Sequence, residues 1–436
     1  MGILLLIIVL LFEVGLSVYS VITKSKQVKI KSWMRVSSFV VFVILTLTSI
    51  IVWSFRWILP GLLLFILAVK ATITLLRLRN KSQELQPKTT KVILKTITIT
   101  LTMVIALLPA IVFPQHKSPK VTGQYKVSNA TYTYVDEKRI ETFSEKEQNR
   151  FVNVKYWYPE DTNETYPLLV FSHGATGINS SNSSTFTELA SHGYIVASID
   201  HPYHSFYTKS NDGEVVLINS DYNREVSNAN TDGIYSKKEV FKIIQKWMKL
   251  RTEDISFVID TIVNNTAINN DPIYQQINTE KIAVFGHSMG GAASVWLGRE
   301  RSDIDAVVNI DAPYFSEIDY NDDIDDFVTR ENDYTTPILN IYSDDVWKQL
   351  DSSGLYAANK LDNAHFKDAI TVYFQGAKHL SLTDLPLVSP LLANLLQGGS
   401  ATIDPYYCIE TENELILQFF DDVLKGKGQF NPQQTY

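Results

Sequence analysis

Four long apolar stretches occupy the first 115 residues of the chain, at about residues 2–22, 35–55, 57–76 and 92–113. Each is close to the roughly 20 residues that a helix needs to cross the hydrocarbon core of a bilayer. A core helix of a water-soluble protein would carry a polar stripe, which these stretches lack. We therefore expect an all-α region of four transmembrane helices in residues 1–115, followed by a separate domain in residues 116–436.

Charge divides the chain at the same place. Residues 1–115 carry 13 lysines and arginines against two acidic residues, whereas the rest of the chain carries 26 basic and 45 acidic residues, a net charge of −19. A large acidic domain repels phosphate, so a nucleic-acid partner is excluded. Cys408 is the only cysteine, which excludes a disulfide-rich scaffold.

The basic residues also predict an orientation, because loops rich in lysine and arginine stay in the cytoplasm. The second loop between the predicted spans holds only Arg56. The first loop holds Lys24, Lys26, Lys29, Lys31 and Arg35, and the third holds Arg77, Arg79, Lys81, Lys88 and Lys91. We expect a multi-pass protein of the cell membrane, with both termini and the second domain outside the cytoplasm.

Two charges lie within the predicted spans at similar depths, Glu13 in the first span and Lys70 in the third. The sequence allows an ion pair between them inside the membrane. It equally allows Lys70 to extend toward the membrane surface while Glu13 lies inside the helix bundle.

Beyond Pro114, short β-branched and aromatic runs alternate with longer helical stretches. The runs are 150–158, 166–172, 194–199, 281–285, 304–310, 337–342 and 369–374, and the helical stretches lie near 183–192, 238–266, 289–299 and 409–424. This alternation predicts an α/β domain with a mostly parallel sheet flanked by helices. The acidic stretch 316–326 does not match a calcium loop, and we interpret it as a solvated loop.

The strongest chemical signal is a G-x-S-x-G sequence, Gly286-His287-Ser288-Met289-Gly290, between a predicted strand and a predicted helix. In this motif the serine lies on a tight, strained turn that exposes its oxygen, and the glycines remove side chains that would clash. The helix that follows directs its N-terminal dipole at the serine. The motif predicts that Ser288 is a nucleophile.

A serine nucleophile needs a base, and only His365 and His379 follow Ser288 in the chain. His379 follows the last predicted strand, where catalytic groups of open α/β sheets lie, whereas His365 precedes it. We therefore predict that His379 is the base. The third member is an acid, and the residues leave two positions open: Asp311 after one strand, and Asp344 or Asp345 after the next.

An oxyanion hole needs two backbone N–H donors. Met289, directly after the serine, supplies one. The loop His173-Gly174-Ala175 follows a buried strand, and we predict Ala175 as the second donor, with His173 as a structural residue at the strand end. Within the long insertion before the nucleophile strand, Tyr203 and Phe206 are candidates for a substrate pocket.

These motifs together resemble the platelet-activating factor acetylhydrolase (lipoprotein-associated phospholipase A2) branch of the α/β-hydrolases. The resemblance covers about residues 120–425 and is carried by 152–159, 170–174, 189–201, 280–291, 310–312 and 376–385. It implies an α/β-hydrolase fold, and it implies that Asp311, in its Asp-Ala sequence, is the acid of a triad with Ser288 and His379. It also implies oxyanion donors at Ala175 and Met289, and chemistry without a metal or an organic cofactor.

The sequence therefore predicts a membrane-anchored serine ester hydrolase that acts outside the cytoplasm. The resemblance implies a lipid-like or short-acyl ester as substrate, including phospholipid sn-2 acyl groups. One alternative is a cutinase-like polyester hydrolase, because Gly-His-Ser-Met-Gly-Gly also occurs in those enzymes, and their acid would correspond to Asp344 or Asp345. Further alternatives are a general carboxylesterase or thioesterase, and a non-catalytic surface receptor on a hydrolase scaffold.

Overall fold

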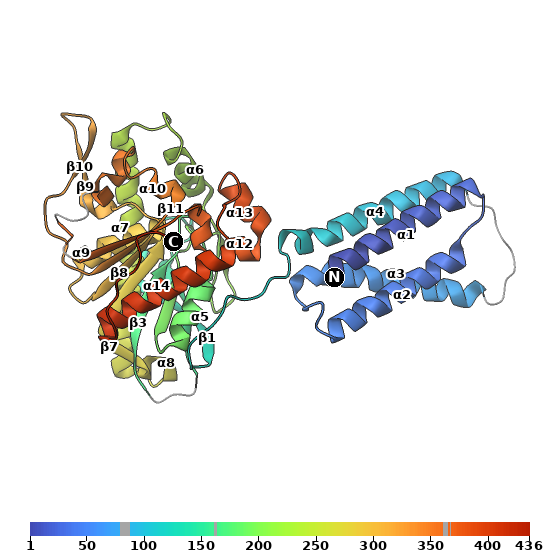
Figure 1. Cartoon of the computed structure of the whole chain (residues 1–436), viewed down its shortest axis with the longest axis horizontal. Helices are drawn as coiled ribbons and strands as arrows, with labels where there is room; N and C mark the ends of the chain where they lie inside the picture. Colours follow the sequence, from blue (N-terminus) through green and yellow to red (C-terminus); the bar gives the residue numbers. More distant parts are fainter. Residues whose placement is uncertain (79–87, 161–163, 361–364, 367) are drawn as a thin grey trace. The chain divides into compact units, whose positions relative to one another are not determined.

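The structure is a computed structural model that describes residues 1–78, 88–160, 164–360, 365–366 and 368–436 (Figure 1). Contacts divide the chain into two compact units, Met1–Lys117 with Val388–Leu392, and Ser118–Leu387 with Ala393–Tyr436. Arg79 and Lys81 of the predicted third loop lie outside the described residues.

Four long helices form the first unit: α1 (Gly2–Ile22), α2 (Val28–Leu47), α3 (Ile58–Leu78) and α4 (Thr89–Val112), with a short 3₁₀ turn, η1 (Phe55–Trp57), before α3. All four are long and apolar enough to cross a membrane. Leu6, Phe42 and Leu64 belong to the core between them, while many other large apolar side chains are exposed. Such outward apolar faces are expected for helices surrounded by lipid.

The second helix differs from the predicted range of 35–55, because it begins at Val28 and ends at Leu47. Three basic residues of the predicted first loop, Lys29, Lys31 and Arg35, lie in its first turns. Lys31 Nζ donates to Ser17 Oγ on α1 at 2.6 Å, and Arg35 forms an ion pair with α1. Because Lys31 and Arg35 have partners on α1, the helix begins at Val28, within the sequence that is predicted to be a loop.

The partner of Arg35 is Glu13, whose side chain is only 2% exposed. Lys70, in contrast, is exposed on α3. The ion pair considered between Glu13 and Lys70 is therefore replaced by a pair that joins α1 to α2. A charged group in a low-dielectric interior needs an opposite charge close by, and Arg35 supplies it.

An eight-stranded sheet in the order β1-β2-β4-β3-β7-β8-β11-β12 organises the second unit. β2 runs antiparallel to both of its neighbours, and the strands from β4 to β12 run parallel to one another. The strands are β1 (Val127–Ile140), β2 (Asn149–Pro159), β3 (Tyr166–Ser172), β4 (Ile195–Asp200), β7 (Ile277–His287), β8 (Ala306–Ile310), β11 (Ile338–Ser343) and β12 (Ala369–Phe374). This confirms the predicted α/β architecture.

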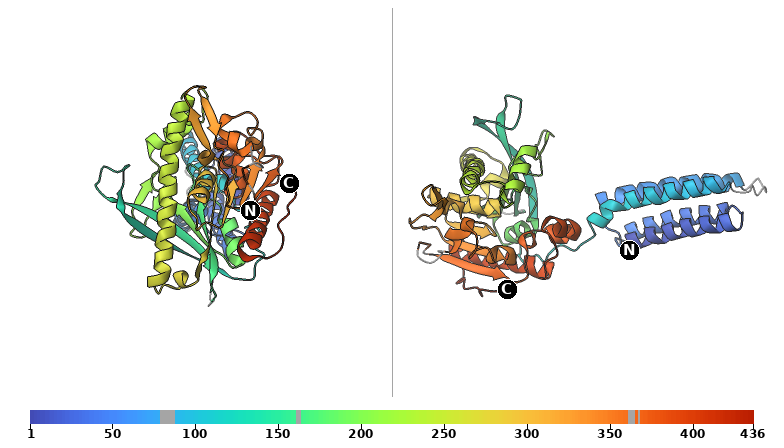
Figure 2. Two further views of the ribbon diagram at one scale, coloured as in Figure 1. Left: turned by 90° about the vertical axis from the view of Figure 1, so that its left-hand side faces the viewer. Right: turned by 90° about the horizontal axis from the view of Figure 1, so that it is seen from above.

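Helices cover both faces of the sheet (Figures 1 and 2). α7 (Lys237–Ile268) and α9 (Met289–Glu300) pack on one face, and α5 (Ser183–Ser191) and α14 (Pro405–Lys425) pack on the other. The central strands β3, β4, β8 and β11 are continuous apolar runs because both of their faces are buried. Figure 2 shows α7 and α14 on opposite sides of the sheet.

Local sequence sets the ends of the long helices. Ser236 and Glu239 form a capping box at the start of α7, in which each side chain accepts from the backbone of the other. Asp404 accepts from two N–H groups in the first turn of α14, and Gly426 ends this helix with φ of 62°. Glycine adopts this left-handed conformation without a steric penalty.

The shorter elements lie between these strands and helices. They are β5 (Tyr207–Lys209), β6 (Val215–Leu217), α6 (Ser220–Ala229), α8 (Pro272–Gln275), η2 (Phe315–Glu317), β9 (Ile318–Asn321), β10 (Asp326–Thr329), α10 (Asp344–Trp347), η3 (Gly354–Tyr356), α11 (Ala357–Lys360), η4 (His379–Leu382), α12 (Leu385–Val388) and α13 (Pro390–Leu396).

The acidic stretch 316–326 is not simply a solvated loop, because it contains β9 and the first residue of β10. These two strands pair antiparallel, with Tyr320 opposite Phe327 and their ring centroids 6.5 Å apart. Cross-strand aromatic pairs stabilise such hairpins. Residues 322–325 of the acidic stretch form the turn between the two strands, and only these residues agree with the predicted loop.

The parallel strands bring distant parts of the chain to one edge of the sheet. Because their carboxyl ends share this edge, β3 leads to the loop that starts at His173, β7 leads to Ser288, and β8 leads to Asp311. β12 ends five residues before His379, which begins η4. The predicted site residues therefore lie in loops at a single edge.

Candidate active site

Ser288 occupies a strained turn between β7 and α9. Its φ of 55° and ψ of −126° lie outside the regions that residues with a side chain normally adopt. The glycines of the motif make this turn possible. A Cβ on Gly286 would lie 2.4 Å from the carbonyl carbon of Gly290, and one on Gly290 would lie 1.9 Å from Ser172 O. Ser288 is half-buried at this turn, which resembles a nucleophile elbow.

His379 and Asp311 form a hydrogen-bonded pair beside this turn. The His379 Nδ1 and Asp311 Oδ2 atoms are 2.7 Å apart, and the carboxylate is completely buried. Ser343 donates to both carboxylate oxygens, through its N–H and its hydroxyl, each at 2.7 Å. The imidazole remains about one-third exposed. A buried carboxylate held this way fixes the orientation and tautomer of the imidazole.

The alternative acids touch other atoms. Asp345 accepts from the backbone N–H of His379 at 3.2 Å, and Asp344 bonds to Tyr373. Neither carboxylate bonds to the imidazole ring among the described contacts. His365 lies 3.7 Å from Asp333 instead. The structure therefore brings together Asp311 and His379.

His287, which was not predicted as a site residue, bonds to the backbone of His379. Its Nε2 donates to the backbone carbonyl of His379 at 2.9 Å, and the two ring centroids are 4.5 Å apart. Burial and the neighbouring His379 lower the pKa of His287 well below its usual value. His287 is therefore a neutral donor at physiological pH.

Ligand atoms of His287, Asp311 and His379 lie within 4.8 Å of one another, a spacing that a metal ion could use. These ligand groups already have hydrogen-bond partners, however, because Asp311 and His379 bond to each other and His287 bonds to a carbonyl. This arrangement fits proton transfer better than metal ligation, and we assign no metal to it.

The predicted oxyanion donors come from two elements. Met289 is the first residue of α9, so its N–H is one of those left free at a helix start. Ala175 is half-buried in the loop after β3. This loop lies against the nucleophile, since a Cβ on Gly174 would be 3.4 Å from Ser288 Cβ and 3.2 Å from His287 Nδ1.

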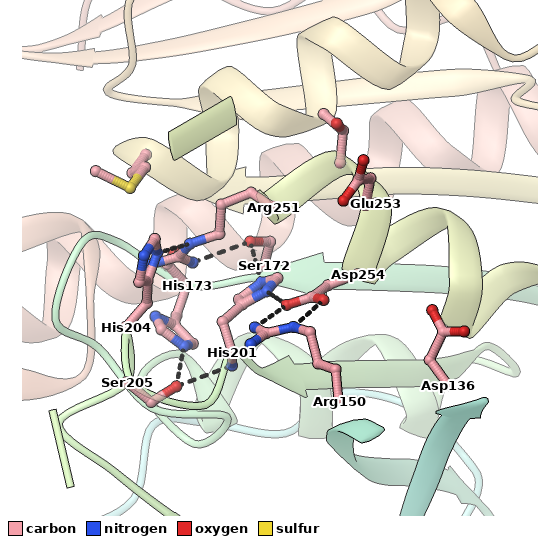
Figure 3. A network of polar contacts seen from close by, with 12 residues as sticks. Asp136, Arg150, Ser172, His173, His201, His204, Ser205, Arg251, Glu253 and Asp254 are labelled. Carbon is pink, nitrogen blue, oxygen red and sulfur yellow. Dashed lines mark hydrogen bonds and ion pairs between the residues drawn. The ribbon is translucent and has the colours of Figure 1, made fainter. Parts of the chain in front are cut away.

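A second chain of serine, histidine and aspartate lies behind this loop (Figure 3). Ser172 Oγ is 2.9 Å from His201 Nε2, and His201 Nδ1 is 2.9 Å from Asp254 Oδ2. The geometry matches a catalytic triad, but all three side chains are completely buried. Since no substrate reaches Ser172, the hydrogen-bonded series Ser172–His201–Asp254 is structural. Its complete burial distinguishes it from Ser288 and His379, which are partly exposed.

Protonation in this buried chain follows from its charges. Burial and the charge of Arg251 lower the pKa of His201 to about 3, so the ring is neutral. Its Nδ1 donates to Asp254 and its Nε2 accepts from the Ser172 hydroxyl. Burial alone would raise the pKa of Asp254, but the charge and hydrogen bonds of Arg150 hold it far below its usual range. Arg150 binds the carboxylate through Nε and Nη2 at 2.7 and 2.6 Å.

Arg251 is the second residue that sequence reasoning missed. Its side chain is completely buried, and its guanidinium donates to the carbonyls of His173, Gly174 and Ala175 at 2.8, 3.1 and 3.2 Å. Tyr222 adds a hydrogen bond of 2.6 Å to the Ala175 carbonyl. One sequence signal was present, because Arg251 lies within the apolar stripe of α7, where a charge is unexpected.

The predicted pocket residues lie in the segment after β4. Tyr203 is half-buried with φ of 67°, and its ring stacks on Phe143 at 5.5 Å. Phe206 is 64% exposed. Among the described residues no ring pair joins Tyr203 or Phe206 to His379, and a role of either in substrate binding stays a prediction. His173 is buried and bonds to Ser205, in agreement with a structural residue.

Three comparisons relate the chain to known proteins. Residues 142–435 match the family model described as "Platelet-activating factor acetylhydrolase, isoform II". Platelet-activating factor acetylhydrolase of Canis lupus familiaris is 31% identical over 147 residues, which are 31% of this chain and 32% of that protein. The protein of the same name from Gallus gallus is 26% identical over 286 residues, which are 62% of this chain and 64% of that protein.

The matches therefore span from about a third to just under two-thirds of the length of these relatives. Among solved structures, a ferulic acid esterase from Streptomyces cinnamoneus superposes with a TM-score of 0.54 at 17% sequence identity. The superposition covers 72% of this chain and 96% of that chain. At this identity the match supports the fold alone.

Proposed function

Because the chain belongs to the platelet-activating factor acetylhydrolase, isoform II, family, we propose that it is a serine hydrolase of carboxylic esters. The observation that carries the proposal is the 2.7 Å hydrogen bond between His379 Nδ1 and the buried carboxylate of Asp311, beside the strained turn of Ser288. A nucleophile on such a turn, next to an oriented imidazole, is the arrangement that acyl transfer requires.

In the proposed reaction, His379 Nε2 takes the proton of Ser288 Oγ as this oxygen attacks the ester carbonyl. The imidazolium then gives the proton to the departing alcohol, leaving an acyl group on Ser288. A water molecule, deprotonated by the same imidazole, releases the acid and restores the serine. Asp311 holds the imidazole and stabilises its charged form.

The negative oxygen of each tetrahedral intermediate is bound by the N–H groups of Ala175 and Met289. Both groups lie at the edge of the sheet where Ser288 lies, one in the loop after β3 and the other at the start of α9. The α9 dipole adds a favourable potential at the same position. Loss of one such donor costs about 10²–10³ in rate in comparable sites.

For the substrate we propose a lipid-like or short-acyl ester, including the sn-2 acyl group of a phospholipid. The support is the name of the relatives, which are acetylhydrolases of platelet-activating factor. A hydrolysis screen of short-chain p-nitrophenyl esters, phospholipids, thioesters and polyesters distinguishes this class from a cutinase-like, thioesterase or general carboxylesterase activity.

We further propose that residues 1–115 anchor the protein in the cell membrane through α1 to α4, and that residues 116–436 form the catalytic domain outside the cytoplasm. The support is the length and apolar character of the four helices, together with the basic residues of the first and third loops.

The decisive experiment replaces Ser288 with alanine. We expect hydrolysis of p-nitrophenyl butyrate to fall to the background rate while expression and thermal stability stay unchanged, because only the nucleophile is lost. A fluorophosphonate probe should label the wild-type protein at Ser288 and leave the variant unlabelled. A wild-type protein that neither hydrolyses esters nor reacts with the probe would favour the non-catalytic receptor.

A further inference from the structure

Three side chains bond to the backbone carbonyls of the loop after β3. His173 Nδ1 bonds to Gly174 O at 2.6 Å, Tyr222 bonds to Ala175 O, and Arg251 makes the largest number of these bonds. The guanidinium of Arg251 binds three successive carbonyls, those of His173, Gly174 and Ala175, at 2.8–3.2 Å. Figure 3 shows Arg251 beside Ser172 and His173, in the same network as His201. The nearby carboxylates of α7 pair with other cations, Glu253 with Arg139 and Asp254 with Arg139 and Arg150. The guanidinium of Arg251 therefore forms its hydrogen bonds mainly with the loop.

The middle bond of the three has a geometric consequence. Gly174 O and the Ala175 N–H belong to one peptide group, which is planar, with its C=O and N–H pointing in opposite directions. A donor that fixes the direction of Gly174 O therefore also fixes the direction of the Ala175 N–H. The loop is close to the nucleophile, since a Cβ built on Gly174 would lie 3.4 Å from Ser288 Cβ. Arg251 binds this peptide at its carbonyl oxygen, on the side opposite to the N–H.

The charge of Arg251 acts through the same bond. A hydrogen bond to a carbonyl polarises the peptide and strengthens its N–H as a donor. The guanidinium stays protonated in proteins, and its side chain is completely buried, where charges interact more strongly than in water. A negative charge that forms near the Ala175 N–H therefore experiences both a stronger donor and a fixed positive charge behind it.

Neighbouring residues hold the guanidinium and the loop in place. Arg251 Nε lies 3.4 Å from His204 Nδ1, and the His204 ring stacks on Tyr222 with centroids 3.6 Å apart. The Tyr222 hydroxyl donates to Ala175 O at 2.6 Å. The carbonyl oxygens on both sides of the Ala175 N–H are therefore fixed by donors from α6 and α7.

We propose that Arg251 is a positioning residue for ester hydrolysis: it orients the Gly174–Ala175 peptide so that the Ala175 N–H faces the oxyanion, and its buried charge strengthens this donor. The inference rests on the proposed function and adds to it the group that prepares the oxyanion hole. Arg251 contacts no reacting atom and acts only through the Ala175 N–H. Because this N–H binds the oxyanion, Arg251 stabilises the transition state and does not bind the substrate.

The first test compares Arg251→Met and Arg251→Lys in the full chain, purified in detergent, with p-nitrophenyl butyrate as substrate. For the methionine variant we expect kcat to fall about 10²-fold or more, with KM within about twofold of wild type. The lysine variant should recover part of kcat, because an ammonium restores the charge but cannot bind three carbonyls with the same fork. The matched control is Arg299→Met, which removes a mostly buried guanidinium that pairs with Glu317. It should lower the thermal midpoint and keep kcat.

The second test measures binding of a trifluoromethyl ketone, which forms a tetrahedral adduct with the serine. Its affinity should fall with kcat in the Arg251 variants and stay unchanged in Arg299→Met. Millimolar guanidinium should raise kcat of Arg251→Ala and leave Ser288→Ala inactive.

A folded Arg251→Met protein with wild-type kcat and ketone affinity would overturn the inference. If this variant does not fold, Arg251→Lys decides by the same two readouts, since wild-type values there would show that the fork is dispensable. Failure of the proposed function looks different, because the wild-type protein would then hydrolyse no ester or Ser288→Ala would stay active.

Discussion

Asp311 and Asp345 both touch His379, but at different atoms. Asp311 binds the ring at Nδ1, whereas Asp345 accepts from the backbone N–H. Only the ring contact selects the tautomer that leaves Nε2 free to accept a proton from serine. Two carboxylates at one histidine therefore have separate roles, one in orienting the imidazole and one in holding the loop.

We expect Asp311→Asn to lower kcat by about 10⁴-fold, because an amide can hold the ring in the wrong tautomer and cannot stabilise the imidazolium. Asp345→Asn is the matched control and should lower kcat less than about tenfold. Steady-state kinetics with p-nitrophenyl butyrate measures both. A larger loss in the Asp345 variant would assign the acid to the following strand, as in cutinase-like enzymes.

Stability should fall on acidification. Burial lowers the pKa of four imidazoles, that of His201 to about 3 and those of His173, His204 and His287 well below the usual value. The unfolded chain takes up protons on these groups near pH 6.5, while the folded chain does not. Stability is therefore complete above about pH 6.5 and falls as the pH drops toward 3, by up to about 1.4 kcal/mol per pH unit for each imidazole.

Thermal unfolding at pH 7.5, 6.5 and 5.5 checks this dependence. The midpoint should change little between pH 7.5 and 6.5 and drop between pH 6.5 and 5.5, and this drop should be smaller in His201→Gln, which carries one imidazole fewer. A midpoint that is constant over this range would show that these rings are protonated in the folded state or exposed to water.

The chemistry of single residues could be predicted where a motif carries it. Ser288 follows from its glycines, and His379 follows from its place after the last strand. Arg251 could not be found in this way, because its carbonyl partners lie 76–78 residues away in the chain. Asp254 likewise depends on Arg150, which is 104 residues distant. Only the folded sheet brings these groups together.

At the scale of elements, the ion pair between Glu13 and Arg35 joins α1 to α2. Ser17 of α1 adds two more contacts, from Lys31 Nζ at 2.6 Å and from Thr96 Oγ1 of α4 at 2.7 Å. Three helices thus meet at one polar centre within an apolar bundle. An unpaired charge there has no water to solvate it, so each partner depends on the other.

We expect Arg35→Met to destabilise the helical unit by about 3–5 kcal/mol, because it leaves Glu13 buried without its partner. The double variant with Glu13→Gln should recover part of this loss. Thermal unfolding in detergent measures all three variants, and Lys70→Met, which removes an exposed cation of α3, is the control. Equal destabilisation by the single and double variants would mean that the pair contributes no coupling.

Element boundaries follow from sequence where a strand is a continuous run of apolar and β-branched residues, as in the fully buried β3 and in β12, which is mostly half-buried at the sheet edge. The predicted ranges 166–172 and 369–374 coincide with β3 and β12. β1 was missed because it is an edge strand whose side chains are mostly half-buried or exposed, so it shows no apolar run. α2 was misplaced because its charged start reads as a loop until its partners on α1 are known.

At the scale of the whole molecule, the family match begins at residue 142 and leaves the four apolar helices outside it. Their orientation depends on the loop charges alone. We expect reporter fusions at either terminus to be active only outside the cytoplasm, and fusions after Lys24 or Lys88 to be active only inside it. A cytoplasmic C-terminus would place the hydrolase on the other side of the membrane and reverse the proposed topology.

β1 has a practical consequence for work on the isolated hydrolase unit. It lies at the edge of the sheet, before the family match begins, and covers β2 along its length. A recombinant fragment cut at residue 142 would remove it and expose the backbone N–H and C=O groups of Asn149–Pro159, a strand with mostly buried side chains. Bare edges of this kind recruit strands from other copies and precipitate. The exposed charges of Glu137 and Lys138 on β1 oppose such pairing, so a soluble fragment for crystallisation should start before Val127.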